Sequence, residues 1–104
     1  MKKYQQEIDD WVQGYEEPYW PALSIFARIV EEVGEVGRLL NHMYGSKPKK
    51  VSEAEQELGQ EIADVMFSLI CLANKHNIDL DIEMDKVIEK SRNRDKDRFD
   101  KKQK

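Results

Sequence analysis

The feature that most constrains this chain is an apolar stretch near its middle, EIADVMFSLICLA, which runs from Glu61 to Ala73. On a helix that turns about 100° per residue, Val65 and Leu72 fall close to the direction of Glu61. Glu61 then lies inside an apolar stripe, and Asp64 lies beside it. Burying a carboxylate is costly unless it is paired or bound to a metal. The stretch is too short to span a bilayer, which takes about 20 residues. It predicts a central helix of a soluble protein that carries costly acids.

The composition of the rest of the chain is typical of a single all-α domain. A length of 104 residues suits one domain, and charged residues make up 37% of it. The long segments are rich in Glu, Lys, Leu, Gln, Met and Ala, and turn dipeptides are sparse. We therefore expect an all-α fold.

Charge, cysteine content and the N-terminal sequence exclude several classes of protein. A net charge of -4 gives no overall field that favours nucleic acid. The single cysteine, Cys71, excludes a disulfide within the chain. The segment MKKYQQEIDDW lacks the apolar run of a signal peptide. We expect a cytoplasmic protein with no membrane partner, and a nucleic-acid partner is not favoured.

Hydrophobic periodicity and helix breakers predict four helices, at about residues 2–13, 21–44, 52–76 and 81–99. Pro21 suits a first helical turn, Gly45 and Asn77 suit helix ends, and Ser52 opens a capping-box pattern with Glu55. We expect an antiparallel, oligomeric four-helix bundle that forms one domain over residues 1–99. Residues 100–104 are expected to form a basic flexible tail.

The linker YEEPYWP between the first two helices concentrates the aromatic residues Tyr15, Tyr19 and Trp20. These rings could close one end of the core, which is the common role of clustered aromatic side chains. They could also form a platform on which a flat base stacks. The sequence leaves both interpretations open.

Two of the predicted helices each carry carboxylates three residues apart. Glu32 and Glu35 lie in the apolar stripe of the second helix, with Glu31 next to them, and Glu61 and Asp64 lie on the third. Residues at this spacing share a helix face. Counted from the turn between the two helices, both pairs lie at similar heights at a rise of about 1.5 Å per residue. We expect the four carboxylates to converge.

A converging set of carboxylates has two explanations. Ligation by oxygen alone suits Mg²⁺ or Mn²⁺ and argues against a structural zinc site. Alternatively, the acids pair with Arg28, Arg38 or Lys75, or they line the rim of the bundle in water. The match between the two helices favours a divalent-cation site.

These motifs resemble a known family. The segments EEVGE, from Glu31 to Glu35, and EIAD, from Glu61 to Asp64, resemble the EExxE…ExxD signature of the MazG-type nucleoside triphosphate pyrophosphohydrolases, and the likeness covers roughly residues 8 to 99. The resemblance implies hydrolysis of (d)NTPs between the α and β phosphates, with the clearing of non-standard nucleotides as one role.

The resemblance also assigns residues to the carboxylate site. It implies that Glu32, Glu35, Glu61 and Asp64 bind Mg²⁺, with Mn²⁺ as an alternative, and that Glu31 is an additional acid. One of these carboxylates must accept the proton of the attacking water, and Glu31 and Glu32 are the candidates.

Further assignments concern the substrate and the assembly. The resemblance implies that Lys90, Asn93 and Arg94 contact phosphates, and His42 stands where some relatives place an aromatic side chain that stacks on the base. Trp20, in the aromatic linker, is a second candidate for holding the base. A homo-oligomer, either dimer or tetramer, is implied too, with helices from two chains forming each active site.

Other functions remain open on the sequence alone. A phosphoribosyl-ATP pyrophosphatase or a dimeric dUTPase could share the same core. A helical interaction or regulatory module with purely structural acids is an alternative from a different class, and it predicts neither hydrolysis nor an effect of metal. Binding of nucleic acid by the basic tail is disfavoured because the body of the protein is acidic.

Overall fold

A computed structural model of the chain describes residues 1–45, 51–95, 98 and 102, and most of these residues lie in four helices. These are α1 (Lys2–Val12), α2 (Ala22–Tyr44), α3 (Val51–Lys75) and α4 (Leu80–Asp95). The described residues contain no strand, so the all-α prediction is confirmed. The predicted helices agree with the observed ones within two residues, except at the end of the fourth. Three predicted features lie outside the residues and side chains that the structure describes. They are the last turn of the fourth helix, the capping box at residues 52–55 and nearly all of the tail.

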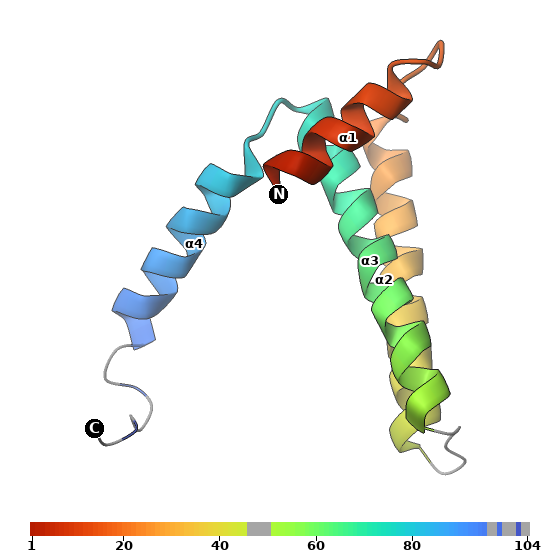
Figure 1. The fold of residues 1–104 in the computed structure, drawn as a ribbon, viewed down its shortest axis with the longest axis vertical. Helices are drawn as coiled ribbons and strands as arrows, with labels where there is room; N and C mark the ends of the chain where they lie inside the picture. The colour runs from red at the N-terminus through yellow and green to blue at the C-terminus, as the bar shows by residue number, and fades with distance from the viewer. Residues whose placement is uncertain (46–50, 96–97, 99–101, 103–104) are drawn as a thin grey trace.

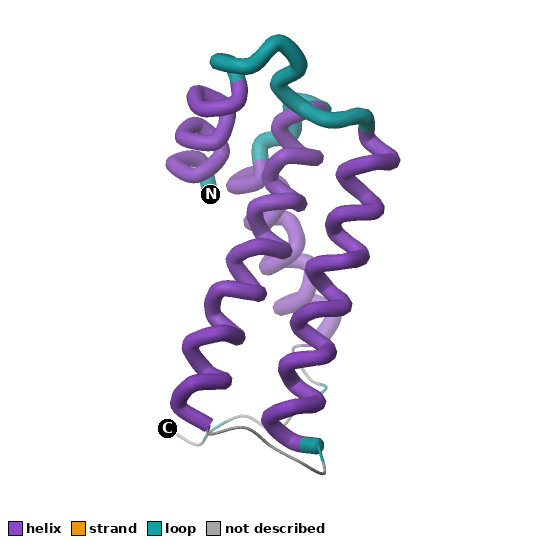
Figure 2. Tube along the Cα trace, turned by 90° about the vertical axis from the view of Figure 1, so that its right-hand side faces the viewer, coloured by secondary structure: helices purple, strands orange, loops and turns teal. Residues whose placement is uncertain are grey.

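Helices α2 and α3 form an antiparallel pair, which lies side by side in Figure 2 and in which α2 runs along α3 from behind in Figure 1. Apolar side chains of the two helices are buried, including Ile25, Leu39, Met43, Ile70 and Ala73, and Leu39 and Met43 of α2 pack against Leu58 of α3. Two polar residues, Glu32 and Ser68, are buried with them. The antiparallel arrangement predicted from the matching heights of the carboxylates is therefore present.

Helix α1 crosses the end of the α2–α3 pair (Figure 1). Val12, at the last position of α1, is buried there. The chain then follows the aromatic linker to Pro21, whose carbonyl accepts hydrogen bonds from the amides of Ser24 and Ile25 at 2.9 and 3.1 Å. Pro21 thus starts α2 as predicted, since its fixed φ suits the beginning of a helix. The linker is held over the same end of the pair.

Helix α3 ends in a hydrogen-bonded turn that changes the direction of the chain. The amide of Ile78 donates to the carbonyl of Ala73 at 2.9 Å, and the amide of Asn77 donates to that of Asn74 at 3.1 Å. This is a Schellman motif, which requires a left-handed residue just beyond the helix. Asn77, with a φ of 57°, is that residue, as the sequence predicted.

Helix α4 departs from the α2–α3 pair after this turn and extends away from it (Figure 1). The side chain of Asp79 caps α4 by accepting hydrogen bonds from the amides of Asp81 and Ile82. None of the α4 residues is buried, and its apolar side chains Ile82, Met84, Val87 and Ile88 are 42–53% exposed. The sequence predicted four helices correctly, but within one chain α4 does not pack along the others.

None of the helices, over the residues that the structure describes, has both the length and the apolar character needed to cross a membrane.

The turn at Asn77 gives a test of the fold. We expect Asn77→Ala to lower the free energy of unfolding by about 1 kcal/mol, because a Cβ without a locally bonding side chain is disfavoured at positive φ. Asn77→Gly is the matched control and should be close to neutral, since glycine adopts this conformation freely. Urea denaturation measures both. Equal losses in the two variants would contradict the importance of the left-handed conformation.

Candidate active site

Three carboxylates from two helices meet at the α2–α3 interface. Glu32 comes from α2, and Glu61 and Asp64 come from α3. One ligand oxygen from each residue lies within 4.8 Å of the others. Glu32 is buried, Glu61 is half-buried and Asp64 is exposed. The group therefore has a buried side against the interface and an open side toward solvent, as a site that binds a ligand requires.

Glu35, the fourth predicted ligand, lies next to this group but is not part of it. Its carboxylate is 3.7 Å from the guanidinium of Arg38, one turn along α2. Its negative charge still acts on Glu61, where it contributes to a raised pKa. Glu35 therefore lies within electrostatic range of the group, and its assignment as a ligand stays a prediction.

Arg28 is the cation that α2 places against the carboxylates. Its Nε lies 3.1 Å from Glu32, four residues along the helix, and its Nη1 lies 3.4 Å from Glu31. Glu31 points outward, with 69% of its side chain exposed. The pairing with arginine that the sequence allowed as an alternative is therefore present at Glu32. Among the described residues, no basic side chain forms an ion pair with Glu61 or Asp64.

The pKa of the Glu61 carboxyl group is raised from its ordinary value. Loss of solvent around the carboxylate is the main cause that raises its pKa. The charges of Asp64, Glu32, Glu35 and Glu57 raise it further, in that order. A carboxylate that resists ionisation because others surround it is stabilised when a cation binds among them.

A cavity of about 470 Å³ opens beside the carboxylates, toward the end of the pair that α1 and the linker cover. Glu32, Asp64 and Arg28 form one side of it, and Ser68 and Cys71 line it from the next turns of α3. Aromatic rings line the rest: Trp11, Tyr15, Tyr19, Trp20 and Phe67. A volume of this size is typical of a site for a small molecule, roughly 300–1,000 Å³.

The aromatic rings of the cavity come from three separate segments. Trp11 lies edge-on to Tyr15, with ring centroids 5.5 Å apart, and to Phe67, at 6.3 Å. Trp20 and Tyr15 are both 57% exposed, so their faces stay available to a ligand. Of the two roles that the sequence left open for the linker, the platform beside a cavity is the one that this geometry favours.

The side chain of His42 lies on the other side of the carboxylates from this cavity. It lines a small separate hollow with Glu35, Arg38, Leu39, Glu57 and Glu61. His42 is ten residues beyond Glu32 on α2, about 15 Å at the usual rise per residue. One base therefore cannot contact both Trp20 and His42, and the stacking role predicted for His42 has no support from the cavity.

The predicted phosphate-contacting residues Lys90, Asn93 and Arg94 are exposed on α4. This helix extends away from the carboxylates, so one chain does not bring the three side chains to them (Figure 1). The guanidinium of Arg94 binds the carboxylate of Asp95 through two hydrogen bonds, of 3.1 and 2.9 Å. This pairing raises the pKa of Arg94 and lowers that of Asp95.

Comparison with known proteins identifies the family. The model of the MazG nucleotide pyrophosphohydrolase domain matches residues 21–99, which include α2, α3 and α4. The chain belongs to the MazG nucleotide pyrophosphohydrolase family. The resemblance that the motifs of α2 and α3 suggested is thereby confirmed.

Two MazG relatives agree with this chain in sequence and fold. The YpjD protein of Bacillus subtilis strain 168 is 44% identical over 103 residues, 99% of this chain and 93% of YpjD. Its crystal structure matches with a TM-score of 0.77 at 43% identity, over 86% of this chain and 91% of that chain. A crystal structure of the Bacillus-conserved MazG protein, a nucleotide pyrophosphohydrolase, matches with a TM-score of 0.75 at 37% identity, over 86% of this chain and 85% of that one.

The donor set of this MazG chain fits a hard divalent cation. Carboxylate oxygens are the ligands that Mg²⁺ and Mn²⁺ prefer, and neither His nor Cys belongs to the group of Glu32, Glu61 and Asp64. Loss of solvent is the main cause of the raised pKa of Glu61, and the neighbouring negative charges that add to it would be offset by a bound cation. These residues could hold a cation on the open side of the group.

Sequence reasoning missed two walls of the cavity in this MazG chain. Trp11 and Phe67 line the cavity, but neither belongs to the aromatic linker or to the carboxylate motifs that the sequence brought out. A signal was available on α3, because Asp64, Ser68 and Cys71 follow at spacings of four and three and share one helix face. That face leads from the carboxylates directly to the floor of the cavity.

The raised pKa of Glu61 predicts how stability depends on pH when metal is removed. A group whose pKa is raised by folding contributes stability that is fully present below its ordinary pKa and is lost as pH rises through the folded-state value. We expect Glu61→Gln to be more stable than the native protein in chelator near neutral pH, with the difference vanishing near pH 4. Thermal unfolding measures it. Saturating Mg²⁺ should raise the melting temperature of the native protein and raise that of the variant much less.

Glu7→Gln is the matched control for this experiment, because Glu7 is an exposed carboxylate of α1 away from the site. We expect the control to melt like the native protein with and without Mg²⁺. A native melting temperature that saturating Mg²⁺ leaves unchanged would contradict a specific site at Glu61.

Proposed function

We propose that this MazG chain hydrolyses nucleoside triphosphates to nucleoside monophosphate and pyrophosphate in the presence of Mg²⁺ or Mn²⁺. The supporting observation is that Glu32 and Asp64 belong both to the carboxylate group and to the wall of the aromatic cavity. A ligand with a flat ring in the cavity therefore has its adjoining phosphates at the carboxylates. A nucleoside triphosphate has this combination of a ring and a polyphosphate.

The carboxylates would hold the metal, with Glu32, Glu61 and Asp64 as direct ligands and Glu35 beside them. A bound cation offsets phosphate charge, polarises the attacked phosphorus and lowers the pKa of a water molecule. The rigid α2–α3 pair positions these ligands, which helices do more precisely than loops.

The proton of the attacking water needs an acceptor. Glu31 lies outside the three-carboxylate group, next to Glu32 in sequence, and Arg28 contacts both side chains. The carboxylate of Glu31 would therefore not be a metal ligand, and it is our first candidate for the general base. Glu32 remains the second candidate.

The aromatic cavity would hold the base. Trp20, Trp11 and Tyr15 offer partly exposed ring faces, and stacking on such faces contributes about 1–3 kcal/mol per base. Phe67 and the small side chains of Ser68 and Cys71 close the floor. The cavity is thus the subsite that we assign to the nucleoside.

The leaving pyrophosphate requires cations that one chain does not supply at the cavity. Arg28 is the one basic side chain, among the described residues, that lines it. Lys90, Asn93 and Arg94 would contact the β and γ phosphates if α4 of a second copy approached the carboxylates. Positive side chains at that place stabilise the charge that develops on the leaving group.

A seam on the outer face of α2 supports such a homo-oligomer. Its positions alternate at spacings of three and four and comprise Leu23, Phe26, Val30, Val33, Gly37, Leu40 and Tyr44. The six larger side chains are 39–81% exposed. This spacing is that of a helix seam that packs against another helix. We assign the seam to contact with a second copy.

The glycines of α2 agree with close approach of a second helix. A Cβ added at Gly34 or Gly37 would meet no other atom within 4 Å. Packing within the chain therefore does not require glycine at either position, although each costs about 1 kcal/mol of helix stability relative to alanine. Backbone contact across an interface would explain why the helix carries them.

Sedimentation tests the assembly. We expect a mass that is a multiple of 12.3 kDa, and we expect Val33→Asp to shift the protein toward monomer, because the charge would be buried in the seam. If each active site uses two copies of the chain, activity should fall as the oligomer dissociates. Gln6→Glu, which adds a charge to the exposed face of α1, is the control and should keep the native mass. A stable native monomer at micromolar concentration would contradict this assignment.

The bond that is cut is tested with ¹⁸O-labelled water. Glu32, Glu61 and Asp64, which lie next to the cavity assigned to the nucleoside, would hold metal near the α phosphate. We therefore expect the label in the monophosphate, with unlabelled pyrophosphate as the other product, and no turnover by Glu61→Gln. Mass spectrometry of the products locates the label. Label in orthophosphate, with nucleoside diphosphate left over, would show attack at the γ phosphate and would overturn the proposal.

A further inference from the structure

A network of side-chain hydrogen bonds lies behind the aromatic cavity, where α1 crosses α3, and Asn74 is at its centre. The amide nitrogen of Asn74 donates to the hydroxyl of Tyr19 and to the backbone carbonyl of Gln5, both at 3.0 Å. Its amide oxygen accepts from the Gln5 side chain at 2.9 Å. All three bonds are partly buried. Asn74 does not line the cavity, so any effect on a ligand must pass through its partners.

The hydroxyl of Tyr19 connects this network to the cavity wall. It donates to the carboxylate of Asp9 at 2.6 Å while it accepts from Asn74. Burial, the largest cause, and the bond to Asp9 raise the pKa of Tyr19 to about 12, so the hydroxyl stays neutral and keeps its proton for this bond. Asp9 comes from α1 and Asn74 from α3. One hydroxyl therefore fastens the linker to two helices.

Among the residues that the structure describes, no other side chain of the linker is held in this way. Within the described part of the chain, the two bonds of Tyr19 are the only side-chain hydrogen bonds made by residues 14–20. The neighbouring residues Pro18 and Trp20 both line the cavity. A non-helical segment that carries an exposed tryptophan needs such an anchor to present the ring in one orientation.

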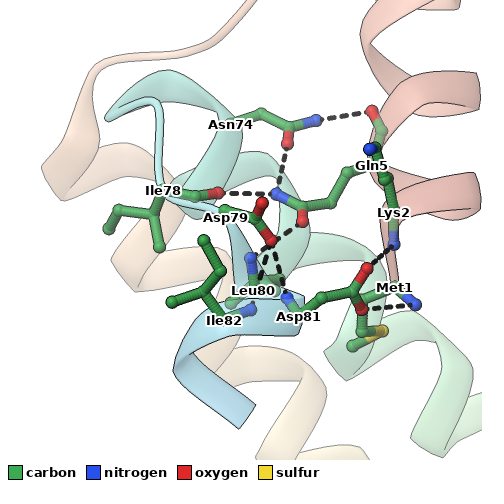
Figure 3. Close-up of polar contacts among 9 residues, drawn as sticks. All are labelled: Met1, Lys2, Gln5, Asn74, Ile78, Asp79, Leu80, Asp81 and Ile82. Atoms are coloured by element: carbon green, nitrogen blue, oxygen red, sulfur yellow. Dashed lines mark hydrogen bonds and ion pairs between the residues drawn. The ribbon is translucent and has the colours of Figure 1, made fainter. Parts of the chain in front are cut away.

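Gln5 extends the network to the start of α4, as Figure 3 shows. Its side-chain nitrogen donates to the carbonyl of Ile78 at 2.8 Å, and its side-chain oxygen accepts from the amide of Leu80 at 3.0 Å. The backbone amide of Lys2 also donates to the side chain of Asp81. The same network therefore holds the cavity wall and sets the direction in which α4 leaves.

We propose that Asn74 and the Tyr19 hydroxyl are positioning groups that hold the aromatic linker in the orientation that stacks on the nucleotide base. This inference rests on the proposed function, because it takes the cavity as the site of the base. Groups that are ordered before binding lower the entropy lost when the ligand arrives. Loss of the anchor should therefore weaken binding of the nucleoside part, while the carboxylate site for phosphates and metal stays intact.

The test is a pair of variants, Tyr19→Phe and Asn74→Ala. Tyr19→Phe keeps the ring that lines the cavity and removes one hydroxyl. We expect KM for a nucleoside triphosphate to rise about 3- to 10-fold, which is the range for loss of a hydrogen bond of this kind, with kcat little changed. Hydrolysis of inorganic tripolyphosphate, which has no base, should keep its rate. Tyr4→Phe, which removes a hydroxyl from an exposed tyrosine of α1, is the matched control and should behave like the native protein.

The double variant separates positioning from general loss of stability. If both groups act through one hydrogen bond, Tyr19→Phe combined with Asn74→Ala should raise KM no more than the larger single effect. Multiplying effects, or equal losses with the nucleotide and with tripolyphosphate, would overturn the positioning role. Native KM values in both single variants would also overturn it.

A binding measurement distinguishes this inference from the proposed function itself. Both tryptophans of the chain line the cavity, so intrinsic fluorescence reports binding of a nucleotide whose α–β bridge is a non-hydrolysable methylene. We expect the native protein to bind this analogue and Tyr19→Phe to bind it about 3- to 10-fold more weakly. Binding of this analogue, together with no hydrolysis of the natural triphosphate by the native protein, would contradict the proposed activity and leave the positioning role standing. Absence of binding by the native protein would overturn both.

Discussion

The structure depends on one costly arrangement, which is the burial of Glu32 in the interface of α2 and α3 beside two further carboxylates. Three acids with oxygens within 4.8 Å of one another oppose the pairing of the helices that carry them. Apolar burial along the two helices and the ion pair with Arg28 offset this repulsion. An interface built only for stability would place apolar residues at these positions, because replacing buried charges with apolar groups is often stabilising. The presence of the acids at this interface supports the proposal that they bind a cation.

The same helix pair determines what lies next to the carboxylates. One turn before Glu32, Arg28 reaches the cavity, and one turn beyond Asp64, Ser68 forms its floor. The distance between the carboxylates and the floor of the cavity, which includes Phe67, is therefore fixed by helical geometry and not by a loop. Only the outer wall of the cavity depends on the linker between α1 and α2. Hydrogen bonds of Tyr19 with α1 and α3 hold that linker in place.

The sequence predicted the helices and the carboxylate group well, because both follow from local periodicity. Glu32 and Glu61 were predicted to lie inside apolar stripes and Asp64 beside one, and Asn77 was predicted to end a helix. The direction of α4 was not predictable, since it depends on how Gln5 meets the turn after α3, a contact between residues more than seventy positions apart. The roles of Trp11 and Phe67 were missed for the same reason. The helices that carry these two residues were predicted correctly, but the crossing of α1 over α3 determines which side of each ring faces the cavity.

Under the proposed function, the balance of charge would leave one chain of this MazG protein with an incomplete site. A triphosphate brings several negative charges to a place that already holds three carboxylates, and Arg28, the one basic side chain of the described residues at the cavity, is engaged with Glu31 and Glu32. In the proposed reaction, metal ions would offset part of this excess at the carboxylates, whereas the charge on the departing pyrophosphate would develop farther out. The basic side chains of α4 suit that outer position, and the turn at Asn77 directs them away from their own cavity. The exposed apolar residues of α2 and α4 need a covering surface as well. One arrangement would meet both requirements: a second copy that covers the apolar faces and brings α4 to the neighbouring site.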